Sequence, residues 1–335
     1  MSQEMLHALE LIHSRLTALE VSMTPSQTPS LEVPGYRRRY APKDSSQKTY
    51  TPAQVAKAVS KFNSYWKIVT EGRDINFQFG ADNLNHVTSI EPALLRNEAL
   101  SKLLNYRPTI IEPFAGSGAD TISFLWNMHP QTIYCTELST ENTISFLKSN
   151  VERFQEVNKQ DTETHVVIMN SDASTFFTDV SEDENADGDF LGLHADLLYL
   201  DPPWTLPGEK TEAVPARLVA YLQKEVFVPM YRRGFSPKLI VLKTRFPWEE
   251  MHKLMDKFPG YTHASSMAFT PQHNKIYFHV LLNTSHYTVE EWQPSHEYWE
   301  IYKDVMKPSP GDRGSFKEPP SGDKGGFKYQ RSYKQ

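Results

Sequence analysis

Hydrophobic residues in the middle of the chain fall into two kinds of segment. Short apolar runs bounded by polar or turn-forming residues are typical of buried strands in a parallel sheet. Longer stretches with apolar residues three or four positions apart are typical of helices. The runs predict strands over 110–112, 133–135, 165–169, 196–200 and 239–242, with helices over 119–127, 139–155, 214–231 and 248–256.

Two further apolar runs within residues 262–282 meet near Pro271, which predicts a β-hairpin at the end of this alternation. Strands that alternate with helices favour a sheet with helices on both faces. We therefore expect an α/β fold with a mostly parallel, seven-stranded sheet and an antiparallel last strand, as in many mixed sheets. This domain should span residues 107–285.

The segments before this domain have a different character. Apolar residues in 5–23 recur at spacings of four and three, which predicts a heptad helix over residues 1–24. This short helix either packs on its own domain or mediates self-association or docking to a partner helix. Residues 25–53 are rich in Pro, Ser, Thr and Gln and contain Arg37-Arg38-Arg39, so we expect a disordered basic linker.

Residues 54–106 predict a helical extension that covers the cofactor or the substrate. Pro52 is suited to the first turn of one helix. Thr88, Ser89 and Glu91 suit the start of a second helix, from about Pro92 to Leu104.

After the domain, residues 286–306 predict a C-terminal helix or extension, and residues 307–335 a disordered basic tail rich in Gly and Pro. The tail repeats GDRGSFK as GDKGGFK and contains aromatic residues among its basic ones. This composition suits an arm that touches single-stranded nucleic acid, and it suits a solubilising tail nearly as well.

Charge and cysteine content narrow the setting. The net charge is -6, but acidic residues cluster in 181–194 and basic residues in 37–39 and in the tail, so local charge matters more than the sum. The single cysteine, Cys135, excludes an internal disulfide and is typical of a reducing compartment. No apolar run has the length of a membrane span and no secretory signal is recognised. We expect an intracellular protein of the nucleus or cytoplasm, with no membrane partner; cellular and viral origins both stay open.

The stretch from Thr109 to Glu137 carries the first chemical signal. A strand ends at Glu112, the small-residue loop 114–118 follows, and a helix leads to a second strand that ends near Glu137. Glycines let the backbone approach a ligand because they have no Cβ. The loop lacks the Gly-Lys-Ser/Thr of a phosphate-binding loop and the third glycine of a dinucleotide fingerprint. It fits S-adenosylmethionine, with Glu137 placed to accept hydrogen bonds from a ribose; a structural strand-to-helix turn is the alternative.

Asp201-Pro202-Pro203-Trp204 directly follows a predicted strand and is the second signal. The amino nitrogen of a base is a poor nucleophile because its lone pair is delocalised into the ring. The Asp201 carboxylate and the Pro202 carbonyl can accept hydrogen bonds from such an amino group, and the prolines hold these acceptors rigidly. Trp204 offers a surface on which the base can stack. The motif predicts methyl transfer to an exocyclic amine, although Asp-Pro-Pro also ends strands in many loops.

The run from about Phe79 to Asn283 resembles the class I S-adenosylmethionine-dependent methyltransferases that act on guanine N2, particularly the trimethylguanosine synthase group of RNA cap enzymes. VTSIEPALLRNEAL, IIEPFAGSGADTISF, YLDPPW, LIVLKTRFPWEEM and KIYFHVLLN carry the resemblance. The cofactor loop precedes DPPW, whereas the order is permuted in the mRNA adenine-N6 enzymes. The chain departs from the family at Asp120 (usually Asn), Asp201 (usually Ser), and Thr205 and Leu206 (usually glycines).

The resemblance implies a Rossmann-like methyltransferase domain that binds S-adenosylmethionine, and no metal site is predicted. Four acidic residues fall at predicted strand ends: Glu112, Glu137, Asp172 and Asp201. They could share one edge of the sheet, where such folds bind ligands. The cofactor-binding candidates are Thr88, Glu112, Phe114, Ala115, Gly116, Gly118, Thr121, Glu137, Asp172 and Asp201. The catalytic candidates are Asp201, Pro202 and Trp204, and the substrate-binding candidates are Pro203, Trp204 and the phosphate-contacting Lys210, Lys243 and Arg245.

The favoured function is methylation of guanine N2 in an RNA cap, with capped RNA or rRNA as the partner. A cationic cap base would stack on Trp204, with Trp66 or Trp248 as a second aromatic partner. One alternative is an adenine-N6 methyltransferase acting on RNA or DNA. Another is a non-catalytic RNA-binding or scaffold subunit that keeps the fold.

Overall fold

The structure is a computed structural model of the 335-residue chain. It describes residues 50–70, 72–81, 87–139, 142–158, 163–179, 195–206, 213–255, 258, 260–269, 276–289 and 292, all of which belong to one compact unit, 45–335. The heptad helix, most of the basic linker, the acidic loop 181–194 and the basic tail lie outside the described residues.

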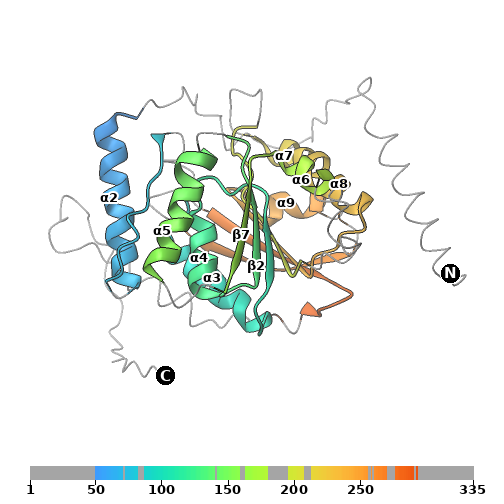
Figure 1. The fold of residues 1–335 in the computed structure, drawn as a ribbon. Coiled ribbons are helices and arrows are strands. Elements are labelled where there is room, and N and C mark those ends of the chain that lie inside the picture. Colours follow the sequence, from blue (N-terminus) through green and yellow to red (C-terminus); the bar gives the residue numbers. More distant parts are fainter. Residues whose placement is uncertain are drawn as a thin grey trace, which may run out of the picture. The chain divides into compact units, whose positions relative to one another are not determined.

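A seven-stranded sheet forms the centre of the fold (Figure 1). Its strands are β1 Thr109–Glu112, β2 Thr132–Thr136, β3 His165–Met169, β4 Leu197–Leu200, β5 Leu239–Thr244, β6 Tyr261–Phe269 and β7 Ile276–Asn283. The order is β3-β2-β1-β4-β5-β7-β6. β7 pairs antiparallel with β5 and β6, while the β1–β2, β1–β4, β2–β3 and β4–β5 pairs are parallel. The predicted mostly parallel sheet with an antiparallel last strand is confirmed.

Helices cover both faces of the sheet, as expected (Figure 1). One side carries α2 Pro52–Val69, α3 Ile90–Leu103, α4 Ala119–Asn127 and α5 Ser149–Val157; the other carries α6 Ala173–Asp179, α7 Pro215–Leu222, α8 Val228–Arg232 and α9 Trp248–Met255. Each face has its own apolar core, because neighbouring strand residues such as Ile110 and Ile111 point to opposite sides.

Two predicted helices differ from expectation in that each contains a π-helical segment. Asn142–Lys148 (η2) precedes α5, and Gln223–Phe227 (η5) joins α7 to α8. π-helical turns are rare and often occur at functional sites. η2 is of interest because its residue Leu147 contacts the glycine loop, as described below.

The N-terminal extension packs on the side of α4 and α5. α2 begins at Pro52, so the linker ends earlier than the predicted residue 53, and Thr51 with Gln54 forms a capping box. Trp66 is buried between Trp126 and Phe154, with ring centroids 6.0 Å from each. α2 is thereby fixed to the domain by burial of a large aromatic side chain.

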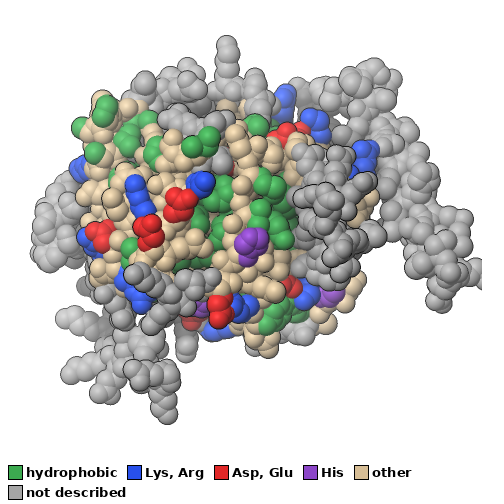
Figure 2. Space-filling model, in the orientation of Figure 1, with side chains coloured by type: hydrophobic (Ala, Val, Ile, Leu, Met, Phe, Trp, Pro, Cys, Tyr) green, Lys and Arg blue, Asp and Glu red, His purple; other side chains and the backbone are tan. Residues whose placement is uncertain are grey.

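α3 begins at Ile90, two residues before the predicted start, and Ser89 at its N-cap makes no side-chain capping bond. The predicted capping role of Thr88 is also not seen, since its hydroxyl bonds elsewhere in the core. No helix among the described residues is long and apolar enough to cross a membrane. On the face drawn in Figure 2, acidic and basic side chains lie close together.

Candidate active site

The parallel strands bring the two sequence signals to one edge of the sheet. β1 lies between β2 and β4, and the chain order reverses at β1. The glycine loop follows β1 and the Asp201–Trp204 corner follows β4, its paired neighbour. Open α/β sheets bind ligands at the carboxyl ends of strands beside such a switch point.

The glycine loop donates backbone hydrogen bonds to the last residue of β2 and to the side chain of Glu137 that follows it. Gly116 N–H donates to Glu137 Oε2 at 2.8 Å, and Ser139 N–H donates to Glu137 Oε1 at 3.0 Å. Ala115 N–H donates to the Thr136 carbonyl at 3.0 Å. Glu137, expected to hold a ribose, therefore also fixes the loop that follows the neighbouring strand.

Gly116 and Gly118 adopt left-handed backbone conformations, with φ of 54° and 87°. Gly118 is the N-cap of α4, and a Cβ added there would lie 2.7 Å from Leu147 Cδ1 of η2. Gly118 is thus required by both its φ and the approach of Leu147.

Glu112 and Thr121 lie beneath the loop in the core. Thr121 donates its hydroxyl to Glu112 Oε2 at 2.7 Å, and the two residues are 0% and 1% exposed. Burial, together with the nearby charge of Asp120, raises the pKa of Glu112 well above its ordinary value. Both side chains are buried and bonded to each other, and their contact with a cofactor remains a prediction.

Cys135 lies beside this pair and is fully buried. Burial and the proximity of Glu112 raise the pKa of its thiol. A buried thiol with a raised pKa is unreactive, so Cys135 serves the packing of the core.

Asp172 follows β3 and precedes α6. Its Oδ1 accepts hydrogen bonds from Thr175 N–H at 2.6 Å and from the Ser174 hydroxyl at 2.7 Å. Burial alone would raise the pKa of Asp172, but these bonds outweigh it and hold the pKa below its ordinary value. The structure gives Asp172 a helix-capping role, and its contact with the cofactor remains a prediction.

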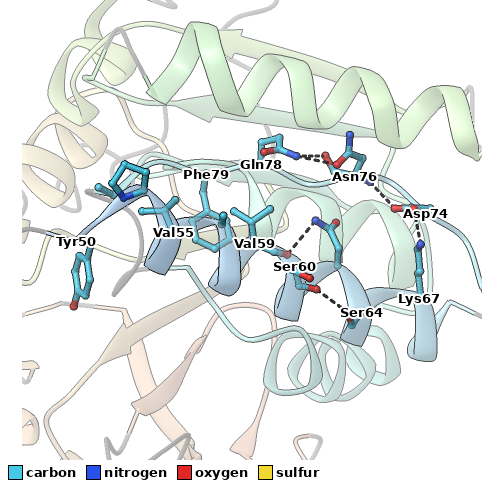
Figure 3. A pocket seen from close by; sticks show the side chains of 14 residues that line it. Tyr50, Val55, Val59, Ser60, Ser64, Lys67, Asp74, Asn76, Gln78 and Phe79 are labelled. Atoms are coloured by element: carbon cyan, nitrogen blue, oxygen red, sulfur yellow. Dashed lines mark hydrogen bonds and ion pairs between the residues drawn. The ribbon is translucent and has the colours of Figure 1, made fainter.

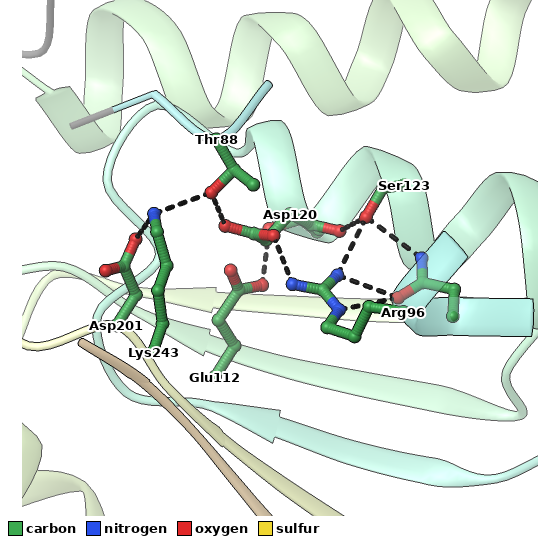
Figure 4. Close-up of polar contacts among 9 residues, drawn as sticks. Thr88, Arg96, Glu112, Asp120, Ser123, Asp201 and Lys243 are labelled. Carbon is green, nitrogen blue, oxygen red and sulfur yellow. Dashed lines mark hydrogen bonds and ion pairs between the residues drawn. The ribbon is translucent and has the colours of Figure 1, made fainter. Parts of the chain in front are cut away.

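A chain of buried polar contacts joins the Asp201 corner to the glycine-loop helix (Figure 4). Lys243 Nζ of β5 lies 2.5 Å from Asp201 Oδ2 and donates to Thr88 Oγ1 at 2.7 Å. The Thr88 hydroxyl donates in turn to Asp120 Oδ2, and Asp120 lies in the first turn of α4. Four groups from distant parts of the chain therefore tie the two signals together.

Arg96 of α3 closes this chain at its other end. Its Nη1 lies 2.6 Å from Asp120 Oδ1, and the side chain is 0% exposed. The guanidinium also lies over the rings of Phe124, Tyr199 and Phe278, at 4.3–5.1 Å. The charges of Arg96 and Lys243 outweigh burial and hold the pKa of Asp120 below its ordinary value.

Asp201 is influenced in the opposite direction. Burial raises its pKa to about 6, although the ammonium group of Lys243 acts to lower it. Asp201 is thus ionised at neutral pH and can accept hydrogen bonds from an amine.

Trp204 and Arg245 form a stacked pair at the same corner. The Arg245 guanidinium carbon lies 3.6 Å from the centroid of the Trp204 ring, and Lys243 Nζ lies 5.7 Å from it. Pro202 is buried, and Pro203 and Trp204 are half-buried. One face of the indole is therefore covered by a cation.

Two expectations about the substrate side are corrected, those for Lys243 and Trp66, while the stacking role of Trp248 remains a prediction. Lys243 was expected to contact phosphates, but its side chain is 1% exposed and pairs with Asp201. Trp66, a candidate stacking partner, is buried in the core. Trp248 stacks on His263 at 3.6 Å with an interplanar angle of 8°. Lys210 lies outside the described residues.

Sequence reasoning missed Arg96 and the central position of Asp120. One signal was present: Arg96 stands in the apolar segment PALLRNEAL, where an unpaired charge would be costly to bury. Asp120 was noted only as a departure from the family, and its partners come from remote segments that no local pattern connects.

A groove of about 710 Å³ lies elsewhere, between α2 and residues 74–81 (Figure 3). Its lining includes none of Glu112, Glu137, Asp172 and Asp201, so we do not assign the chemistry to it. Two hydrogen bonds through Asn150 link Gln78 in the lining of this groove to Ser117 of the glycine loop. Gln78 N–H donates to Asn150 Oδ1 at 2.9 Å, and Asn150 Nδ2 donates to the Ser117 carbonyl at 2.9 Å.

Among the described residues, no group of three or more His, Cys, Asp or Glu side chains is arranged to hold a metal ion.

No protein-family model and no curated protein matches the chain. Its structure is similar to solved methyltransferases. The delta-N METTL16 methyltransferase domain aligns with a TM-score of 0.46 and 11% identity, over 68% of this chain and 96% of that one. NSun6 from Pyrococcus horikoshii aligns with a TM-score of 0.39 and 17% identity, over 57% and 51%.

TrmK from M. capricolum, in complex with S-adenosyl-homocysteine, aligns with a TM-score of 0.38 and 8% identity, over 56% and 68% of the two chains. Identities and TM-scores this low indicate a similar fold and nothing about the reaction. The chemistry of this protein therefore has to be argued from its own residues.

Proposed function

We propose that this protein is an S-adenosylmethionine-dependent methyltransferase that acts on an exocyclic amino group of a nucleic-acid base. The observation that carries the proposal is the polar chain from Asp201 through Lys243 and Thr88 to Asp120 (Figure 4). It fixes the amine-accepting corner against the helix that the glycine loop begins. A cofactor at the loop and a base at the corner would then be neighbours.

The loop fits this cofactor. Gly116 is left-handed and half-buried, so a ligand can approach the backbone there, whereas the buried Gly118 is needed for packing against Leu147. No lysine follows the glycines to bind a phosphate. Gly116, Gly118 and Glu137 would hold the cofactor, which supplies an activated methyl group on a sulfonium when bound.

The residues of the corner would orient the amine. Asp201 would accept a hydrogen bond from the amino group and favour the positive charge that develops on nitrogen during transfer. Lys243 holds one Asp201 oxygen, which fixes the orientation of the carboxylate. Trp204 would place the base by stacking. The main contribution is alignment, because the methyl group is already activated.

The resemblance favours guanine N2 of an RNA cap over adenine N6 as the acceptor. The cation that covers one face of Trp204 speaks against the positively charged base of a cap.

Calorimetry and labelled methyl transfer test the proposal together. We expect S-adenosyl-homocysteine to bind the full-length protein, and label from S-adenosylmethionine to enter oligonucleotides that contain unpaired purines. Absence of cofactor binding together with absence of transfer would overturn the proposal and favour a scaffold role.

A further inference from the structure

Arg245 covers one face of Trp204, so the charge of a base stacked on the other face affects how tightly that base binds. An indole ring attracts cations through the negative charge of its faces. In this protein Arg245 already lies 3.6 Å from the ring centroid on one side. A base stacked on the opposite side would lie roughly 7 Å from the guanidinium, at which two unit charges still repel appreciably in a partly buried site.

The side chains that could form a second plate for a cationic base are engaged elsewhere. Trp66 packs against Trp126 and Phe154 in the core. Trp248 stacks face to face on His263. A cationic base is best held between aromatic faces, and both of these tryptophans already have ring partners of their own.

We propose that the Trp204 corner selects an uncharged purine and discriminates against the cationic 7-methylguanine base. This inference rests on the proposed function and narrows its substrate class. The base stacks on the indole face opposite Arg245, with its amino group at Asp201. Arg245 stiffens the indole and repels a positive base, while a neutral base gains the same stacking surface without that repulsion.

Calorimetric titration of the full-length protein, saturated with S-adenosyl-homocysteine, tests the proposal with GMP, AMP and 7-methyl-GMP. The probes carry the same phosphate, so its attraction cancels when GMP is compared with 7-methyl-GMP. We expect 7-methyl-GMP to bind on the order of tenfold more weakly than GMP. Equal or tighter binding of 7-methyl-GMP would overturn the proposal.

An Arg245→Gln variant shows whether Arg245 is the cause. It should raise the affinity for 7-methyl-GMP relative to GMP by about tenfold, because the repelling charge is gone. Arg245→Lys keeps the charge and should keep most of the discrimination. The matched control is Arg232→Gln, which removes the same charge from an exposed position at the end of α8. Arg232 precedes the amino end of β5, whereas Arg245 follows its carboxyl end.

The control should leave the ratio of the two affinities unchanged. An unchanged ratio in Arg245→Gln, with both variants folded by thermal unfolding, would contradict the role of Arg245. The two proposals fail differently. If the cofactor product binds but 7-methyl-GMP is preferred, only this inference fails. If neither the cofactor product nor any nucleotide binds, the proposed function fails as well.

Discussion

The glycine loop and the Asp201 corner lie at the same edge of the sheet but are held in different ways. The loop is fixed by neighbours in the βαβ unit, through Gly116 N–H on Glu137 and the left-handed Gly118. The corner is fixed by remote residues, since Lys243 and Thr88 are separated by 155 positions in the chain. Local sequence can therefore specify the loop, whereas the corner depends on the assembled fold.

The largest expected effect comes from breaking the remote support. Lys243→Met removes the ammonium between Asp201 and Thr88 and leaves a largely buried carboxylate without this partner. We expect the free energy of unfolding to fall by about 3–5 kcal/mol, measured by chemical denaturation.

The matched control for that change is Lys224→Met. Lys224 pairs with Glu225 but its side chain is 71% exposed, so stability should change by less than about 1 kcal/mol. A similar loss in both variants would show that the buried pair has no special role. Adding Asp201→Asn to Lys243→Met should restore part of the stability, because the unpaired charge is then absent.

The second prediction separates the corner from the loop by function. Asp201→Ala should lower the rate of methyl transfer by about 10²–10³-fold, the usual effect of removing one preorganised electrostatic contact. Cofactor affinity should be nearly unchanged, because the direct bonds of the loop to Glu137 and Thr136 do not involve Asp201. Calorimetry with S-adenosyl-homocysteine checks this, and a parallel collapse of affinity would contradict the separate roles.

The third prediction concerns the loop. Gly118→Ala forces a side chain into a conformation with φ of 87° and against Leu147. We expect a loss of about 1–3 kcal/mol in unfolding free energy and weaker cofactor binding. Gly72→Ala is the control, because Gly72 has φ of 95° but nothing lies within 4 Å of its added Cβ.

The difference between the two glycine variants isolates the steric contact with Leu147 from the backbone strain. Leu147→Ala combined with Gly118→Ala should reduce that difference. If the two single variants lose equal stability, Leu147 does not limit the loop.

The smallest expected effect is a pH dependence at the corner. The pKa of Asp201 is raised to about 6, so the carboxylate is ionised above that pH and protonated below it. Only the ionised form accepts fully from an amine, so the rate of methyl transfer should rise with pH through about 6. One unit below that pH, the rate should be about tenfold lower than its value at high pH. Asp201→Asn should retain little activity and lose this step in the pH–rate profile.

These differences explain which parts could be predicted from the sequence. The strands and α4 follow from apolar periodicity, and the loop and corner follow from turn chemistry at strand ends. The π-helical segments are not predicted because a single wider turn changes the apolar spacing too little to stand out within a helical pattern. The sequence suggests a phosphate-contacting cation at Lys243, because no residue near it in the chain identifies Asp201, 42 positions away, as its partner.

Arg96 and Asp120 show the same limit. Asp120 begins an apolar helix and Arg96 directly follows two leucines, which indicates burial, but the pairing between them arises only when α3 packs on α4. Contacts of this kind are set by tertiary structure, and they are the ones that hold the candidate site together.

The most direct test of the central claim, that the loop and the corner form one site, is a crystal structure with S-adenosyl-homocysteine and a purine mononucleotide. We expect the sulfur above the loop 114–118 and the base on Trp204, with its amino group between the sulfur and Asp201. Density for the cofactor product in the groove of α2, or for the base on another side of the sheet, would contradict the account.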